Sequence, residues 1–178
     1  MKKMVILIVM VFAACSTINI KGVNKAADFS ITKYKSFGFC AVNKGGDAVG
    51  QHYDENLELL KKEISRQMGM KGVIFKEENP DLLVNIGVVV SEKTQTRETN
   101  FANAGDRTMY MGQRNYSWQS KEVEVGKYKE GTVSLDFVDR AASILVWKGS
   151  AESVLPEKQK NIQSLIQEGM EKLFAEVK

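Results

Sequence analysis

Two aspartates, Asp136 and Asp139, are the best candidates for carboxylate chemistry in this chain. A carboxylate pair can divide the roles of general acid and general base between its members. Such a pair needs converging partners, and the only histidine, His52, is far away in sequence. Residues three apart on a strand also point to opposite faces. We therefore expect Asp139 to have a structural role, accepting a hydrogen bond from the backbone of a turn. A hydrolase that uses Asp136 and Asp139 is the alternative.

The residue types and motifs of the chain do not indicate a zinc site, a serine hydrolase or a phosphate-binding loop. One histidine and two cysteines are too few for a structural zinc site. The chain lacks the Gly-x-Ser-x-Gly elbow of serine hydrolases. Its glycine-rich stretch 43–50 is not followed by the Gly-Lys-Ser/Thr of a phosphate-binding loop. The sequence predicts no enzyme activity, no metal and no cofactor.

The chain begins with two lysines, an apolar run from Met4 to Phe12, two alanines and Cys15. This order is typical of an export signal, and the run is shorter than the roughly 20 residues that span a bilayer. Ala13-Ala14-Cys15 resembles the lipobox of bacterial lipoproteins. The resemblance implies cleavage before Cys15, a diacylglycerol on its sulfur and acylation of the new amino terminus. The alternative is an ordinary secretory signal that contains Cys15 by chance.

Ser16 follows this cysteine. In the enterobacterial sorting rule, an aspartate at that position retains a lipoprotein in the inner membrane. Its absence predicts an outer-membrane lipoprotein whose domain faces the periplasm. Two or more acyl chains hold a protein stably on a membrane, so we expect a partnership with the membrane through lipid on Cys15.

The chain has 178 residues, which is a normal size for one domain. It has 25 basic and 22 acidic residues, and Lys2 and Lys3 of the signal account for most of that excess. A nearly neutral mature chain argues against a nucleic-acid partner. If Cys15 carries lipid, Cys40 has no partner within the chain. Its apolar, strand-like surroundings favour a buried small side chain over a reactive thiol.

Three large aromatic residues, Tyr110, Tyr116 and Trp118, lie in the polar segment 98–119, which is rich in glycine and asparagine. Loops this long in a compact domain are often functional or disordered. Aromatic residues on such a segment suit a partner-binding patch, and an envelope protein or polymer would be the partner. The alternative is that they fold back over one face of the sheet.

Two amphipathic helices and several strands are expected to position these residues. Apolar residues recur at helical spacing in the first helix, from Leu57 to Met68, and form a broad stripe in the last one. The expected elements are a strand over 28–42, a loop over 43–50, a helix over 54–68, a central strand over 82–90, a hairpin over 131–138 and 143–151, and a helix over 156–177. Polar alternation after Val90 suggests that the central strand projects past the core.

This order of elements predicts an α+β fold: a two-layer sandwich in which an antiparallel-rich sheet carries both helices on one face. The domain organisation that we expect is a signal peptide over 1–14, a lipidated tether over 15–27 and a single domain over 28–178. Within the tether, residues 18–25 are also compatible with a first edge strand.

Short motifs in a characteristic order run through most of residues 28–151. They are Asp28-Phe29-Ser30 with Tyr34 and Phe37, Pro80-Asp81-Leu82-Leu83-Val84, Gly131-Thr132-Val133 with Leu135-Asp136 and Asp139, and Val146-Trp147-Lys148-Gly149-Ser150-Ala151. In these motifs the chain resembles the domain-of-unknown-function 4136 family of bacterial lipoproteins. The resemblance implies no enzyme activity. The expected function is that of a membrane-anchored envelope lipoprotein with a noncatalytic binding domain, and a periplasmic hydrolase is the alternative.

Overall fold

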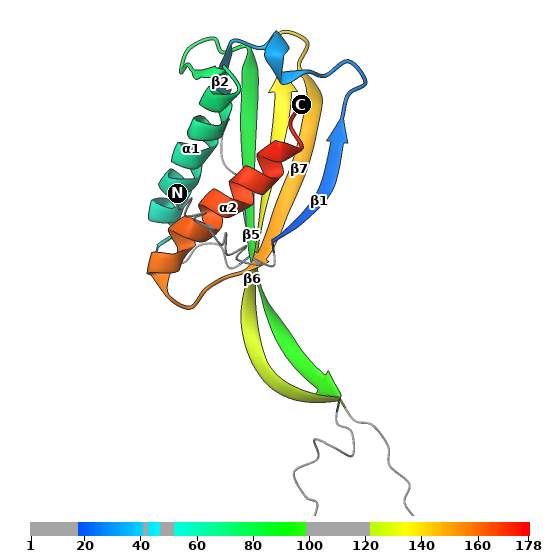
Figure 1. Ribbon diagram of the computed structural model, residues 1–178, viewed down its shortest axis with the longest axis vertical. Coiled ribbons are helices and arrows are strands. Elements are labelled where there is room, and N and C mark those ends of the chain that lie inside the picture. The colour runs from blue at the N-terminus through cyan, green and yellow to red at the C-terminus, as the bar shows by residue number, and fades with distance from the viewer. Residues whose placement is uncertain (1–17, 41–42, 47–51, 99–121) are drawn as a thin grey trace, which may run out of the picture.

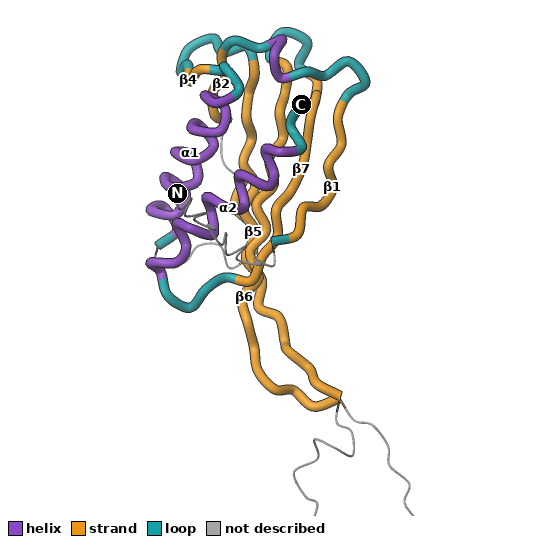
Figure 2. Tube along the Cα trace, in the orientation of Figure 1, coloured by secondary structure: helices purple, strands orange, loops and turns teal. Residues whose placement is uncertain are grey.

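The computed structural model describes residues 18–40, 43–46, 52–98 and 122–178. These residues form an α+β fold in which a mixed sheet of seven strands carries two α-helices (Figures 1 and 2). The elements in chain order are β1 (Asn19–Lys25), β2 (Ser36–Phe39), β3 (Asn43–Gly46), α1 (Tyr53–Met70), β4 (Ile74–Phe75), β5 (Leu82–Glu98), β6 (Glu122–Asp139), β7 (Ile144–Val154) and α2 (Ile162–Ala175).

The sheet has the strand order β1-β7-β6-β5-β2-β4, and β3 also pairs with β5. The strands β5, β6, β7 and β1 pair antiparallel with their neighbours, whereas β2 and β3 run parallel to β5 and β2 runs parallel to β4. The expectation of an antiparallel-rich sheet was therefore wrong, and the sheet is mixed. The sheet contains parallel pairs because of α1. A chain that crosses over through a helix returns parallel to the strand that it left.

Two segments that the sequence left as loop or tether belong to the sheet. Residues 43–46 were expected in a loop because of their glycines, yet they form β3 against Gly87–Val90 of β5. Backbone pairing with a long central strand needs no particular side chain. The glycine content of residues 43–46 therefore did not prevent them from forming a strand. Residues 19–25 form the edge strand β1 beside β7, the second of the two interpretations of this stretch.

The core lies between the sheet and the two helices, which Figure 1 shows on the same side of the sheet. The fully buried Trp147 stacks against Phe137 with ring centroids 4.7 Å apart. Phe137 in turn lies 6.1 Å from Phe174 of α2. A Cβ at Gly149 would lie 2.8 Å from the Trp147 ring, so glycine at this position is required for the tryptophan to pack.

Both helices differ from their expected bounds. α1 continues to Met70, and Gly72, with φ of 80°, takes the left-handed conformation that we expect after a helix end. α2 begins at Ile162 rather than at Pro156. The reason is that the chain stays with the sheet first: the Leu155 N–H donates to the Lys129 carbonyl over 2.8 Å.

The central strand does project past the core, as its polar alternation suggested. β7 follows β6 only as far as the Glu130–Val154 pair, and β3 follows β5 only as far as Val90. Beyond these points the segments 92–98 and 122–129 pair with each other and with no third strand among the described residues, and at their base the Lys129 carbonyl also accepts the Leu155 N–H. We call this two-stranded ribbon the arm, and Figure 1 shows it extending away from the rest of the domain.

Candidate ligand-binding pocket

A cavity of about 770 Å³ lies where the first turns of both helices face the sheet. Each helix has apolar residues near its N-terminal end that are only half-buried, although its stripe is buried further on. On α1, Ile64 and Met68 are buried whereas Leu57 is not. On α2, Leu173 is buried whereas Leu165 is not. The core is therefore incomplete at the end of the sheet from which the arm extends.

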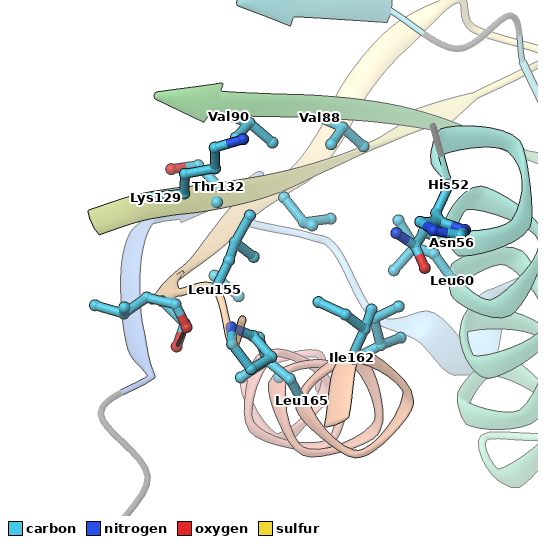
Figure 3. Close-up of a pocket in the computed structure, with 18 of the residues that line it drawn as sticks. His52, Asn56, Leu60, Val88, Val90, Lys129, Thr132, Leu155, Ile162 and Leu165 are labelled. Atoms are coloured by element: carbon cyan, nitrogen blue, oxygen red, sulfur yellow. Dashed lines mark hydrogen bonds between the residues drawn. The ribbon is translucent and has the colours of Figure 1, made fainter. Parts of the chain in front are cut away.

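The walls of the cavity are mostly aliphatic. Figure 3 shows Val88 and Val90 on the sheet, Ile162 and Leu165 on α2, and Leu60 on α1. Preformed cavities of about 300–1,000 Å³ with predominantly apolar walls are typical sites for small-molecule ligands. This cavity has both properties.

Two polar residues of the lining are bonded to each other, and its charged residues are exposed at the rim. Gln159 Nε2 donates to Asn56 Oδ1 over 2.6 Å, which joins the segment before α2 to the first turn of α1. At the base of the arm Lys127 Nζ lies 2.8 Å from Glu92 Oε1. The hydrogen bond and the positive charge of Lys127 lower the pKa of Glu92. Buried Tyr53 and half-buried Thr132 and Ser153 also line the cavity, so its walls are mostly but not wholly apolar.

The first described residue, Ile18, is part of the wall. Only 9% of its surface is exposed, and a Cβ built on Gly169 of α2 would lie 3.9 Å from its Cδ1. Ile18 therefore packs against α2 at the edge of the cavity. It is three residues from Cys15 in the sequence, and three residues of chain reach at most about 11 Å.

A second polar cluster lies in the connections at the other end of the sheet. Asp81 Oδ2 accepts hydrogen bonds from the backbone N–H groups of Lys35 and Ser36, both over 3.0 Å. The Asp81 N–H donates back to Ser36 Oγ over 3.0 Å. We call Tyr34, Ser36, Asp81 and Asp139 the Asp81 cluster. Three of these four residues belong to the motifs of the family resemblance.

Asp139 joins this cluster through Tyr34. Its Oδ1 accepts a hydrogen bond from the Ala142 N–H over 2.9 Å, and its Oδ2 accepts one from the Tyr34 hydroxyl over 3.1 Å. The Ala142 bond, followed by the Tyr34 bond, lowers the pKa of Asp139. Burial, together with the bond to Asp139, raises the pKa of Tyr34 to about 12.

The structure does not bring Asp136 and Asp139 together. β6 pairs with β5 without interruption between them, so residues three apart point to opposite faces. Asp139 instead has Asp81 as its carboxylate neighbour, and that charge acts against the lowering of its pKa. The pKa values of Asp81 and Asp139 are both lowered. Both carboxyl groups are therefore charged at neutral pH, and neither is suited to act as a general acid.

The other candidate residues have simple outcomes. Cys15, Tyr110, Tyr116 and Trp118 lie outside the described residues. His52 is at the cavity rim, where its Nδ1 lies 3.2 Å from Glu55 Oε2. Cys40 is half-buried, and burial raises the pKa of its thiol. In the part of the chain that the structure describes, His, Cys, Asp and Glu form no group that could hold a metal, and no helix is long and apolar enough to cross a membrane.

Nothing in the spacing of the cavity residues along the chain marks them as a site. Leu57, Ile162 and Leu165 are stripe positions that look like ordinary core. Whether such residues are covered depends on how the helix inclines against the sheet, and spacing alone does not reveal that inclination.

The profile of a family described as a domain of unknown function, DUF4136, matches residues 21–176. The chain belongs to the DUF4136 family. The matched segment begins within β1 and ends one residue after α2, so it contains both α-helices and every strand named above except the first two residues of β1. No match was found among curated proteins.

Solved structures show which folds this DUF4136 chain is similar to. It is similar to a PDZ domain protein from Parabacteroides distasonis with a TM-score of 0.52 and 11% identity, over 88% of this chain and 35% of that one. The chain thus spans about a third of that protein, and the likeness concerns the fold alone. A PelC dodecamer from Paraburkholderia phytofirmans has a TM-score of 0.49 at 7% identity, covering 90% of this chain and 97% of that one. A putative neuraminyllactose-binding hemagglutinin homolog from Helicobacter pylori has a TM-score of 0.47 at 12% identity, covering 86% of this chain and 88% of that one.

Proposed function

We propose that this DUF4136 protein is a membrane-anchored lipoprotein of the cell envelope, and that its domain acts by binding an apolar ligand rather than by catalysis. The observation that carries the binding function is the cavity between the helices and the sheet. Its volume is that of a small-molecule site, its walls are mostly aliphatic, and two of its polar residues, Asn56 and Gln159, are hydrogen-bonded to each other.

The sequence before Ile18 supports the anchor. Residues 1–14 would be removed as a signal peptide, Cys15 would carry the lipid, and Ser16 favours an outer-membrane destination facing the periplasm. In the described part of the chain, β1 begins at Asn19. The anchored end would then lie only a few residues from the sheet, on the side of the cavity.

The anchor is tested by replacing Cys15. In cells fed a radiolabelled fatty acid, Cys15→Ala should abolish labelling of the protein and leave it as precursor or in the soluble fraction. Cys40→Ala is the matched control and should be labelled and membrane-bound like the wild type. A mature, membrane-bound Cys15→Ala protein would contradict the anchor.

Binding is tested with an apolar dye whose fluorescence rises in apolar surroundings, N-phenyl-1-naphthylamine, added to purified Cys15→Ala protein, so that no lipid attached to the chain itself competes with the dye. Leu165 is half-buried and lines the cavity, whereas Gln163 is exposed on the same helix. Leu165→Trp should reduce dye binding by about tenfold, because pockets discriminate strongly against lost volume. Gln163→Trp should bind like the Cys15→Ala parent, and equal binding by both variants would sink the proposal.

A further inference from the structure

We infer that the cavity holds one long acyl chain, either from the lipid on Cys15 itself or from a phospholipid of the membrane. This inference rests on the proposed function, because it names the ligand class of the same cavity. Both sources offer the same chemistry to the walls, namely a flexible chain of methylene groups.

The lining is long in one direction. On β6 it runs from Lys127 to Val133, and at roughly 3.4 Å per residue that is about 20 Å of strand. It continues on α2 from Ile162 to Met170. A cavity that follows a strand and a helix for this distance suits an extended chain better than a compact ring system.

The chemistry of the walls also favours a chain without polar groups along its length. The walls are built largely from branched aliphatic side chains, including Val88, Val133, Leu155, Ile162 and Leu165. Gln159 Nε2 donates to Asn56 Oδ1 over 2.6 Å, so this donor and this acceptor already have a partner. A ligand that presents methylene groups to the aliphatic walls gives up no hydrogen bonds to water when it enters, whereas a polar group placed against those walls would.

Charge is found at the rim. Lys127, Lys129 and Glu92 line the cavity at the base of the arm, and all three side chains are exposed. Glu157 is also an exposed residue of the lining, so two positive and two negative groups balance at the rim. The charged head of an acyl chain would therefore stay among charged groups and water at the rim, and only its apolar part would enter between the aliphatic walls.

The proposed anchor brings both sources to the cavity. A lipid on Cys15 would be attached within about 11 Å of the wall at Ile18. The same attachment would keep the cavity beside a bilayer whose phospholipids offer identical chains. No other ligand class is placed at such a high local concentration by the chain itself.

The experiment uses cells that express the full-length protein and incorporate a fatty acid bearing a photoreactive diazirine. After irradiation the protein is purified, cleaved with trypsin and analysed by mass spectrometry. We expect adducts on peptide 161–172, which carries the α2 wall. Peptide 141–148, from the opposite end of the sheet, should lack them.

The mass of the adduct identifies the source. A cross-link between peptide 161–172 and the Cys15 lipopeptide would show the protein's own lipid, and an adduct with the mass of a phospholipid would show a membrane lipid. Either result supports the inference. In Leu165→Trp the adducts should fall by about tenfold, while Gln163→Trp should keep them.

Two results would overturn the inference. One is labelled lipid on Cys15 without any adduct on peptide 161–172 in the wild-type protein. This result would support the anchor and show that no acyl chain lies in the cavity. The other is equal labelling of peptides 161–172 and 141–148. Failure of the proposed function gives other results. Without the anchor, Cys15 would carry no label. Without a ligand-binding cavity, the apolar dye would not bind. Mapping of the wild type does not depend on the folding of any variant.

Discussion

Asp81 is the residue that holds the connections at one end of the sheet together. Its side chain accepts two backbone N–H groups from the start of β2, and its own N–H returns a bond to Ser36. The Asp81 carbonyl also accepts the Arg140 N–H over 3.1 Å. One side chain and its backbone therefore join the entries to β2 and β5 with the turn after β6. This explains the Pro80-Asp81 motif of the family in structural terms.

We predict that Asp81→Ala lowers the free energy of unfolding at pH 7 by about 1–2 kcal/mol, because each net hydrogen bond contributes about 1 kcal/mol. Bonds from Lys35 and Ser36 hold the pKa of Asp81 below its usual 3.8. Its carboxylate therefore stabilises the fold fully above that value and loses this effect as the pH falls through the folded-state pKa. The difference in unfolding free energy between variant and wild type should become smaller only below pH 3.8.

Urea unfolding followed by circular dichroism, repeated from pH 7 down to pH 2.5, measures this difference. Glu77→Ala is the control, because Glu77 is exposed in the segment that leads to Asp81. A loss as large in the control, or a difference that stays constant at low pH, would contradict the assigned role of Asp81.

The arm is the element whose stability differs most from the rest of the sheet. Its strands pair with each other, but no third strand flanks it among the described elements. Isolated two-stranded ribbons are marginally stable in water. Its cross-strand ion pair Lys127–Glu92, at 2.8 Å, is solvent-exposed, and the pair Lys93–Glu130 at its base is long, at 3.9 Å, and only partly covered, so both add little stability.

We predict that backbone amides of 92–98 and 122–129 exchange with solvent roughly 100-fold faster than those of 82–90, because the arm can open without opening the core. Hydrogen exchange followed by mass spectrometry of peptic peptides measures this directly. Equal protection of both halves of β5 would mean that another part of the chain or another molecule covers the arm.

Some secondary-structure elements could be predicted from the sequence better than others. β5 combines a continuous apolar run with a polar tail, so both its burial and its projection could be predicted. The β6–β7 hairpin shows the period of two that reports one buried face. β3 could not be predicted, because its pairing depends on the neighbouring β5 and not on the side chains of its own glycine-rich sequence.

The cavity was less predictable than the fold for a similar reason. The stripes of α1 and α2 identify which face of each helix meets the sheet, but not where along the helix that contact ends. Leu165 and Leu173 occupy equivalent stripe positions, yet one lines the cavity and the other is fully buried. The difference arises from tertiary packing, which short-range spacing does not encode.

The two ends of the whole molecule have different characters. One end is fixed by the hydrogen bonds of the Asp81 cluster. The other holds the beginning of β1 and the base of the arm (Figure 1), and the cavity lies at this same end. If Cys15 is lipidated, the cavity and the base of the arm lie at the end of the domain where the chain is anchored.

The arm leads in sequence to the segment with Tyr110, Tyr116 and Trp118, which we proposed as a partner-binding region. We predict that a photo-crosslinking residue at position 118 captures one dominant envelope protein or polymer in cells, because an arm of this kind presents its end away from the domain. A cross-linking residue at position 77 serves as the control. Absence of any cross-link, in a folded and anchored protein, would exclude this segment as the main contact.

The pairing of β1 with β7 has a consequence for how the protein is made. These neighbours come from opposite ends of the chain, so an exported polypeptide that emerges amino terminus first must wait for its last hairpin before the sheet can close. Pairing between such distant segments is slow, and until it occurs the outer edge of β7 is open to any free strand. If the chain is exported and anchored as proposed, copies tethered side by side on one membrane would meet in this state, and the β1 of one would complete the sheet of another.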